Sequence, residues 1–429
     1  MIVAVGLLLT IGTGCSWPQF RGDPAHSGTQ QFESIIGTGN VAQLTESWSV
    51  VLGPAFEASP AVSNSAVFIG SANGNLYAFD AGKTCAGQST CEPLWTAVPV
   101  SGTFFHSSPA VSDGRVYVDG TDNRLYVFDA AGVTNCSGIP KICRPLWTAS
   151  GALDSSPNVV NGMVYVRGVG GVAAYDAKGS RGCLGSPKVC TPLWTGTMQG
   201  SSLSSPAFAN GFLYVGSSDG NLYAFDTRST EQCSGTPSVC AATWIGSTGT
   251  YIVSSPSVVD DVVYVGSNNK RLYAFDASGN AGCSGAPKQC PPLWTAVTGD
   301  WVQSSPAVAH GLVYVGSNDA RLYAFDARGI INCSGTPKTC APVWTATTGD
   351  AVVSSPAVAN GVIYITSGDG ILSAFDARGV LGCAGTPVAC EPLWSTRVGT
   401  QGSGTSPVVV LGTVYAASYS GDLKTYRLP

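Results

Sequence analysis

The chain has few charged side chains. Its 429 residues include 21 Lys and Arg and 26 Asp and Glu, which is 11% of the chain against roughly 25% in an average soluble protein. The formal net charge is −5, so the sequence lacks the basic footprint of a nucleic-acid-binding protein. A hydrophobic fraction of 44% with so low a net charge also excludes a globally disordered chain. We therefore expect a folded protein that does not bind nucleic acid.

Helical periodicity of useful length is also absent, and no segment after the N-terminus is apolar enough to cross a bilayer. Glycine (54 residues) and proline (26 residues) are abundant, which suits turns and short strands. Histidine is scarce: His26, His106 and His310 are the only three. No loop supplies four metal ligands, and no Cys-x-x-Cys spacing occurs. We expect an all-β protein with no metal site.

Three phrases recur about every 50 residues along most of the chain. The phrase Ser-Pro-x-Val has its proline at positions 60, 109, 157, 206, 256, 306, 356 and 407. A phrase close to LYAFDA ends at Asp80, Asp129, Asp176, Asp226, Asp276, Asp326 and Asp376. A phrase close to PLW contains Trp95, Trp147, Trp194, Trp244, Trp294, Trp344 and Trp394. Each repeat reads as four short strands rich in Val, Tyr and Phe, separated by turns such as Asn-Gly and Asp-Gly.

The two ends of the chain predict that the repeats close into a ring. The last copy stops after its third strand, whereas an additional Trp strand around Trp48 precedes the first copy. The predicted fold is therefore all-β: an eight-bladed β-propeller of four-stranded antiparallel blades, closed by an N-terminal strand that completes the last blade. We divide the chain into a signal segment (1–15), an N-terminal strap (16–44) and a single propeller (45–429).

The N-terminal segment resembles an export signal. Residues 1–14 carry no charge and are about as long as the apolar region of a signal peptide, although no Lys or Arg precedes them. Cys15 follows directly, as in a bacterial lipoprotein signal, in which the cysteine becomes lipidated. Gly12 departs from that pattern, since a larger aliphatic residue is usual there, and an ordinary secretory signal is the alternative. Either reading predicts an extracytoplasmic protein, periplasmic or at the cell surface.

The other cysteines form seven local pairs between the third and fourth strands of successive blades. Regular even pairing in an exported protein predicts disulfides. The predicted pairs are Cys85–Cys91, Cys136–Cys143, Cys183–Cys190, Cys233–Cys240, Cys283–Cys290, Cys333–Cys340 and Cys383–Cys390.

The repeats resemble those of the PQQ-like, quinoprotein-type β-propeller family. Ala324, Asp326 and Trp344 match the tryptophan-docking motif of that family, although the cysteine loop lengthens the interval from Asp to Trp. The segment from Trp17 to His26 is similar to the N-terminal strap of the same family. The resemblance implies either a PQQ-dependent dehydrogenase or a non-catalytic propeller like the lipoprotein of outer-membrane barrel assembly. The dehydrogenases typically carry adjacent cysteines, which this chain lacks, so we favour the non-catalytic branch.

Candidate ligand-binding residues vary between repeats at the predicted mouth of the central channel. They lie in loops that enter the first strand or join the second and third strands: Glu57, His106, Asp154, Tyr251, Trp301, Gln303, Arg124, Arg271 and Arg321. We expect this mouth to bind a protein or a small polar ligand, or to be solvated and unliganded. The repeat Asp and Trp residues are expected to be structural.

Three functions follow from these observations. The first is a monomeric, non-catalytic binding or scaffold module that touches a membrane only through an N-terminal lipid, with no catalytic residue assigned. The second is an alcohol or sugar oxidoreductase that uses PQQ and calcium. The third is a hydrolase or lyase that uses Glu57, His106 and Asp154.

Overall fold

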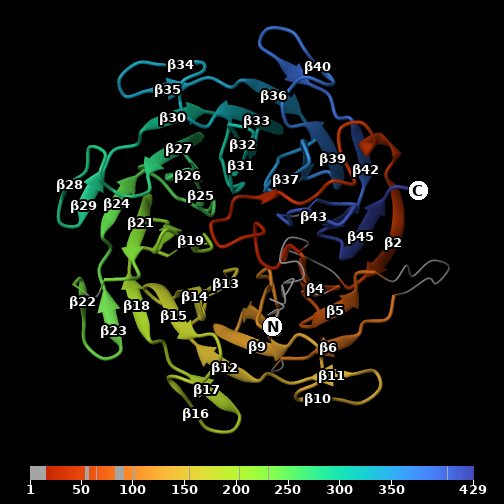
Figure 1. The fold of residues 1–429 in the computed structure, drawn as a ribbon, viewed down its shortest axis with the longest axis vertical. Coiled ribbons are helices and arrows are strands. Elements are labelled where there is room, and N and C mark those ends of the chain that lie inside the picture. The colour runs from red at the N-terminus through yellow and green to blue at the C-terminus, as the bar shows by residue number, and fades with distance from the viewer. Residues whose placement is uncertain are drawn as a thin grey trace, which may run out of the picture.

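Eight β-sheets surround a central channel in a computed structural model of the protein (Figure 1). The structure describes residues 16–53, 58–63, 65–82, 91–99, 102–153, 155–201, 203–229, 231–402 and 404–429. Within these residues the one helix is the 3-10 turn η1 (Val41–Gln43). None of the described helical structure is long and apolar enough to span a membrane. The predicted eight-bladed β-propeller is confirmed.

Each blade has four strands, ordered side by side from the channel to the rim, and neighbouring strands in a blade are antiparallel. The innermost strands are β3 (Ala61–Ser63), β7 (Ala110–Ser112), β13 (Asn158–Val160), β19 (Ala207–Ala209), β25 (Ser257–Val259), β31 (Ala307–Ala309), β37 (Ala357–Ala359) and β43 (Val408–Val410). The second strands are β4 (Ala66–Gly70), β8 (Arg115–Gly120), β14 (Met163–Gly168), β20 (Phe212–Gly216), β26 (Val262–Ser267), β32 (Leu312–Ser317), β38 (Val362–Thr366) and β44 (Thr413–Ala417).

The outer half of the first seven blades carries the repeat aspartate and tryptophan. The third strands are β5 (Leu76–Asp80), β9 (Arg124–Asp129), β15 (Gly171–Asp176), β21 (Asn221–Asp226), β27 (Arg271–Asp276), β33 (Arg321–Asp326), β39 (Ile371–Asp376) and β45 (Asp422–Arg427). The fourth strands are β6 (Trp95–Ala97), β12 (Trp147–Ser150), β18 (Trp194–Thr197), β24 (Trp244–Ser247), β30 (Trp294–Val297), β36 (Trp344–Thr347), β42 (Trp394–Arg397) and β2 (Thr45–Val51).

The last blade is completed by the N-terminal strand, as the sequence predicted. Strand β2 pairs antiparallel with β45, so the beginning and the end of the propeller share one sheet. Trp48 lies opposite Thr425, and the Thr425 hydroxyl donates to the Trp48 carbonyl at 3.2 Å. This pairing replaces two open sheet edges with one continuous ladder.

Six cysteine hairpins project from the rim (Figure 1). Their strands are β10 (Cys136–Ser137) with β11 (Ile142–Cys143), β16 (Cys183–Leu184) with β17 (Lys188–Cys190), β22 (Cys233–Ser234) with β23 (Ser238–Cys240), β28 (Ser284–Gly285) with β29 (Lys288–Cys290), β34 (Cys333–Ser334) with β35 (Thr339–Cys340), and β40 (Cys383–Ala384) with β41 (Ala389–Cys390). A disulfide closes each of these hairpins, which confirms six predicted pairs. Cys85 of the first pair lies outside the described residues.

The prediction of four-stranded, wholly antiparallel blades needs correction. Each cysteine hairpin pairs in parallel with the fourth strand of the preceding blade, as β35 does with β30. Among the described residues, six sheets therefore have six strands and the sheet of β43 has four. The sheet of β37 has five, because the strap strand β1 (Thr29–Gln30) pairs with β37 in parallel. The hairpin supplies partners for backbone groups that an outermost strand would otherwise leave unpaired. The disulfide loop is thus a bridge between blades.

The hydrophobic core lies between adjacent sheets, and the repeat tryptophans are part of it. Trp344 is 1% exposed and packs on the turn that contains Gly379 of the next blade. A Cβ atom on Gly379 would lie 2.3 Å from Trp344 Cδ1, and the φ of Gly379 is +68°. Only glycine meets both conditions without strain. This is the tryptophan docking that the family resemblance implied, and it joins one blade to the next.

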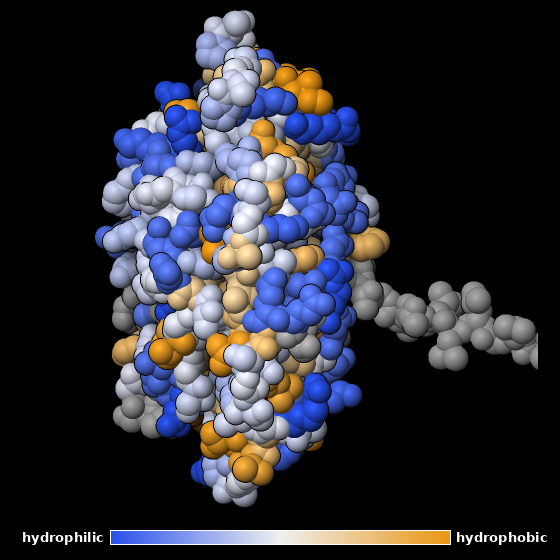
Figure 2. Space-filling model, turned by 90° about the vertical axis from the view of Figure 1, so that its left-hand side faces the viewer, coloured by the Kyte–Doolittle hydropathy of each residue, from blue (hydrophilic) through white to orange (hydrophobic). Residues whose placement is uncertain are grey.

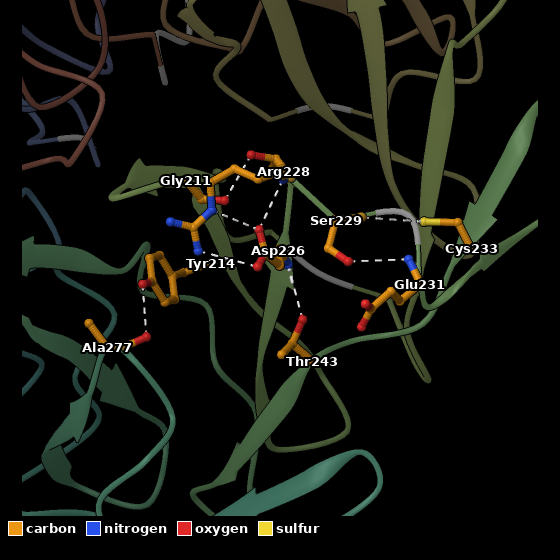
Figure 3. A network of polar contacts seen from close by, with 10 residues as sticks. Gly211, Tyr214, Asp226, Arg228, Ser229, Glu231, Cys233, Thr243 and Ala277 are labelled. Carbon is orange, nitrogen blue, oxygen red and sulfur yellow. Dashed lines mark hydrogen bonds and ion pairs between the residues drawn. The ribbon is translucent and has the colours of Figure 1, made fainter.

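The repeat aspartates shape the turn after the third strand. Asp276 Oδ2 accepts the amides of Asn280 at 2.8 Å and Ala281 at 2.7 Å. Burial alone would raise the pKa of Asp276, but these hydrogen bonds outweigh it and hold the pKa below its usual value. Asp226 instead binds Arg228, whose Nε lies 3.0 Å from Oδ1, and this contact lowers the pKa of Asp226 (Figure 3). The expected structural role of these residues is confirmed.

Candidate functional site

The N-terminal strap runs through the central channel (Figure 1) and contacts all eight blades in chain order. One backbone amide of each blade donates to the strap, at N···O distances from 2.6 to 3.1 Å. The donors are Val62, Val111, Val159, Phe208, Val258, Val308, Val358 and Gly412. The acceptors, in the same order, are Trp17, Pro18, Gln19, Pro24, Ala25, Ser27, Gly28 and Glu33. The strap thus pairs with the innermost strands of seven blades and with the turn that follows β43 in the eighth.

Two strap residues are buried at the centre of the channel. Arg21 is 2% exposed and donates to the carbonyls of Pro306, at 2.8 Å, and Pro356. Burial lowers the pKa of Arg21 to about 9. His26 is 1% exposed, and burial together with the Arg21 charge lowers its pKa to about 3. These groups anchor the strap inside the ring.

The path of the strap distinguishes the two ends of the channel. Trp17 pairs antiparallel with Val62 of β3, so Ser16 lies towards the end of β3 at Ser63. We call that end of the channel the strap face and the other end, near Ser59, the mouth. Phe20 lies at the mouth, where it lines a cavity together with Ser59.

A closed ring of eight serines forms the floor of the mouth. The serine before each repeat proline donates its backbone amide to the hydroxyl of the matching serine in the next blade, at 2.8 to 3.1 Å. The members are Ser59, Ser108, Ser156, Ser205, Ser255, Ser305, Ser355 and Ser406. Each hydroxyl accepts one amide and retains a proton that it can donate to another group.

Above this floor lies a cavity of about 550 Å³. Its wall contains the residue two positions before each floor serine: His106, Leu203, Val253, Gln303, Val353 and Gly404 are the described examples. Glu57 and Asp154 occupy the same repeat position in the sequence but lie outside the described residues. Asp350 and Tyr419 add a carboxylate and an aromatic ring to the lining.

Three exposed aromatic residues lie next to the wall in the sequence and do not line the cavity itself. Phe104, Tyr251 and Trp301 each precede a wall residue by two positions and are 41%, 59% and 46% exposed. The residues between, such as Val302, are fully buried, so side chains alternate between the blade interface and the mouth. The Phe104 ring stacks against His106 at 6.2 Å between centroids, which shows this shared direction. We call the floor, wall and aromatic layers together the mouth funnel.

The predicted site residues therefore separate into three groups. His106 and Gln303 line the cavity, and Tyr251 and Trp301 belong to the aromatic layer next to its wall in the sequence. Arg124 lies 3.8 Å from Asp122 in an exposed ion pair, while Arg271 donates to Thr295 in the strand beside it. Neither of these arginines, nor Arg321, lines the cavity.

Sequence reasoning did not single out most of the funnel. The floor serines were present in the repeated Ser-Pro phrase, and aligning the repeats would have placed Leu203, Val253 and Val353 beside Gln303. No such signal exists for Phe20, because the strap has no repeat. The tertiary structure alone brings it to the mouth.

A second and larger cavity opens on the strap face. It measures about 1210 Å³ and lies between the strap and the innermost strands of blades three to seven. Val258 and Val308 form part of its wall, and Gln31 and Glu33 belong to its strap side. His310, in the turn between β31 and β32, also lines it.

Comparisons with known proteins place the chain in a family. The model of the family described as outer membrane protein assembly factor BamB matches residues 37–135, 143–329 and 335–428. The chain belongs to this family. A search of curated protein sequences finds no match.

The solved structures similar to this BamB-family chain include a BamB protein, an alcohol dehydrogenase and a designed protein. BamB from Moraxella catarrhalis is 16% identical over 90% of this chain and 98% of its own, with a TM-score of 0.62. The quinohemoprotein alcohol dehydrogenase from Comamonas testosteroni is 15% identical over 96% and 80%, with a TM-score of 0.66. The computationally designed Ika8 protein is 13% identical over 89% and 99%, with a TM-score of 0.63. At these identities the likeness concerns the fold alone.

The described lining of the mouth does not fit PQQ with calcium. PQQ carries three carboxylates, yet no Lys or Arg is among the described residues that line the cavity. Calcium takes six to eight oxygen ligands, and Asp350 is the one carboxylate in that described lining. No cluster of three His, Cys, Asp or Glu residues that could hold a metal occurs in the described part of the chain.

Proposed function

We propose that this BamB-family chain is a non-catalytic binding or scaffold module whose ligand site is the mouth funnel. The observation that carries the proposal is the strap. It accepts a backbone amide from every blade, seven of them from innermost strands, and leaves a cavity at the mouth whose described lining contains one carboxylate and no Lys or Arg. Such a surface supports binding, whereas it offers little titratable chemistry for a reaction.

The rim offers a less specific surface. On the side of the rim that faces the viewer in Figure 2, hydrophilic residues are numerous and apolar side chains occur in small separate groups. Half-exposed aromatic rings grouped above a cavity are a stronger sign of a binding site than scattered apolar residues.

The proposal includes export and, through Cys15, a lipid anchor. Six disulfides support an oxidising, extracytoplasmic environment. Ser16 lies on the strap face, so a lipid on the preceding residue would hold that face towards the membrane. The mouth funnel would then point away from the membrane and stay open to partners. Mass spectrometry of the N-terminal peptide from native cells tests the lipid directly.

The decisive test is titration of the purified protein with PQQ and calcium chloride while the absorption spectrum is recorded. We expect no stoichiometric binding and no dye-linked oxidation of alcohols or sugars. The alcohol dehydrogenase from Comamonas testosteroni serves as the positive control. Stoichiometric PQQ binding together with dye-linked turnover would refute the proposal in favour of an oxidoreductase. Crosslinking in native cells, followed by mass spectrometry, would identify a protein partner.

A further inference from the structure

The mouth funnel has a composition that points to one class of ligand. We propose that it binds a short saccharide, with Tyr251, Trp301 and Phe104 packing on the apolar faces of sugar rings and the floor serines binding sugar hydroxyls. This inference rests on the proposed non-catalytic function, since it names the ligand of the same site.

The aromatic layer supplies the first part of the argument. Trp301 is the one exposed tryptophan of the ten in the chain, and it precedes Gln303 of the funnel wall by two positions. Tyr251 holds the equivalent place in the preceding blade, before Val253. Tyr419, 42% exposed, lines the cavity from the last blade. Aromatic rings left half-exposed around one cavity provide flat apolar surfaces on which the C–H faces of a sugar can pack.

The floor supplies the second part. Each floor hydroxyl accepts an amide from the preceding blade, as Ser305 Oγ does from Ser255 at 2.9 Å. What remains on each oxygen is its proton and one lone pair, so each can both donate to and accept from a ligand hydroxyl. Floor serines of seven blades line the cavity together. Ligands with many hydroxyl groups satisfy such a ring, because every ligand oxygen can also donate and accept.

The wall and the volume are consistent with a neutral, compact ligand. Leu203, Val253 and Val353 are apolar, Gln303 and His106 are polar, and Asp350 is the one carboxylate of the described lining. The cavity of about 550 Å³ lies within the range of roughly 300–1,000 Å³ that suits a single small molecule. Sugars combine apolar C–H faces with hydroxyl edges, which matches this mixed wall.

An extended peptide fits the funnel less well. Peptides that add to a sheet need an exposed strand edge for their backbone hydrogen bonds. The strap already holds the channel-facing amides of the innermost strands, such as Val258 and Val308. A peptide would therefore leave backbone groups unpaired at the bottom of the cavity, where buried polar groups are costly.

The test uses the full-length protein and the fluorescence of Trp301. Iodide quenching reports how accessible this exposed indole is, and the other tryptophans are at least partly buried. The probes are maltotriose, cellotriose and chitotriose at millimolar concentration, each also titrated by calorimetry. We expect at least one of them to protect Trp301 from iodide and to give a measurable dissociation constant.

Variants locate the site. Trp301→Ala and Tyr251→Ala should each weaken binding of the active saccharide about tenfold, whereas Trp301→Tyr should retain most of the affinity. Phe32→Ala is the matched control, because Phe32 is 65% exposed and follows Gln31 on the strap face. Circular dichroism melting of each variant confirms that it is folded.

The outcomes distinguish the two proposals. If no saccharide protects Trp301 or gives heat of binding, the saccharide assignment is wrong, while the non-catalytic function stands. Binding that is unchanged in both alanine variants would also overturn it, because the site would lie elsewhere. Peptides that bind in a Trp301-dependent way would replace saccharides as the ligand class. PQQ binding with dye-linked sugar oxidation would overturn the non-catalytic function itself.

Discussion

The backbone amide of Ser406 donates to the hydroxyl of Ser59 at 2.8 Å, although 347 positions separate the two residues. The equivalent bond links each of the remaining pairs of adjacent blades, for example Ser205 with Ser255 at 2.8 Å. The join between the ends of the chain is therefore equivalent to any other blade interface. The serine hydrogen bonds between adjacent blades therefore form a closed ring around the channel.

Removing one link should destabilise this ring. Ser59→Ala leaves the buried amide of Ser406 without its acceptor, which costs about 1–3 kcal/mol of unfolding free energy. Ser234→Ala, at an exposed serine of β22, should change stability by less than about 0.5 kcal/mol. Urea denaturation measures both values, and equal stability of the two variants would contradict the structural role of the ring.

The cysteine hairpins should stabilise the preceding blade. Replacing Cys333 and Cys340 with serine opens a loop of about eight residues and should cost about 2.5 kcal/mol in the chain-entropy model. The Thr295 amide donates to the Lys338 carbonyl at 3.0 Å, so its hydrogen exchange should quicken.

The Thr345 amide is the internal control for that experiment. It donates to the Val388 carbonyl of a different cysteine hairpin at 3.0 Å and should keep its protection. Faster exchange confined to the blade that contains Cys333 itself, with Thr295 unchanged, would refute the bridging role of the hairpin.

Tryptophan docking can be separated from backbone strain by two glycine substitutions. Gly379 and Gly361 both have positive φ, +68° and +78°, so alanine should cost about 1–2 kcal/mol at either position. A Cβ at Gly379 also collides with Trp344, whereas nothing lies within 4 Å of one at Gly361. We expect Gly379→Ala to be less stable than Gly361→Ala by a further 1–3 kcal/mol or so. Equal unfolding free energies in urea would show that the docking contact is dispensable.

Acid should loosen the strap before it affects the blades. The pKa of His26 falls from 6.5 to about 3 on folding, chiefly through burial. Between these values the unfolded chain binds a proton that the folded chain refuses, so stability is lost as the pH falls from about 6.5. The repeat aspartates act lower: hydrogen bonds depress the pKa of Asp276, and its contribution is lost below about pH 4.

His26→Gln tests this assignment. Urea denaturation at pH 7 and pH 5 should show a smaller loss of stability in the variant than in the parent protein. His310, whose pKa burial also lowers, keeps its own contribution in both. An unchanged pH dependence would mean that His26 is reached by protons in the folded state.

The repeats made the fold predictable because each copy carries the same turn and strand residues. The position of Trp48 relative to Pro60 was enough to predict closure, since a fourth strand was missing at the other end. The cysteine loop was placed correctly along the chain but not in space. Its parallel pairing with the preceding blade joins residues such as Thr295 and Thr339 from different repeats, a contact that no local pattern encodes.

For the candidate site, breaks in the repeat were the useful signal. Trp301 and Gln303 differ from their counterparts in other copies, and both belong to the funnel. The basic residues Arg124 and Arg271 vary as well, yet their side chains engage neighbouring groups outside the cavity. Variation between repeats identifies candidate site residues. Whether a candidate side chain points into the cavity depends on the groups that surround it in the folded protein.

By itself the sequence determined the number of blades, the order of strands and the cysteine pairs, because these depend on local periodicity and spacing. The tertiary structure alone decided three further features: the path of the strap through the channel, the attachment of each hairpin to the preceding blade, and the serine ring. Each of these is made by hydrogen bonds between residues of different blades or between a blade and the unrepeated strap. Such bonds exist only once the ring has closed and its inner strand edges face a common axis.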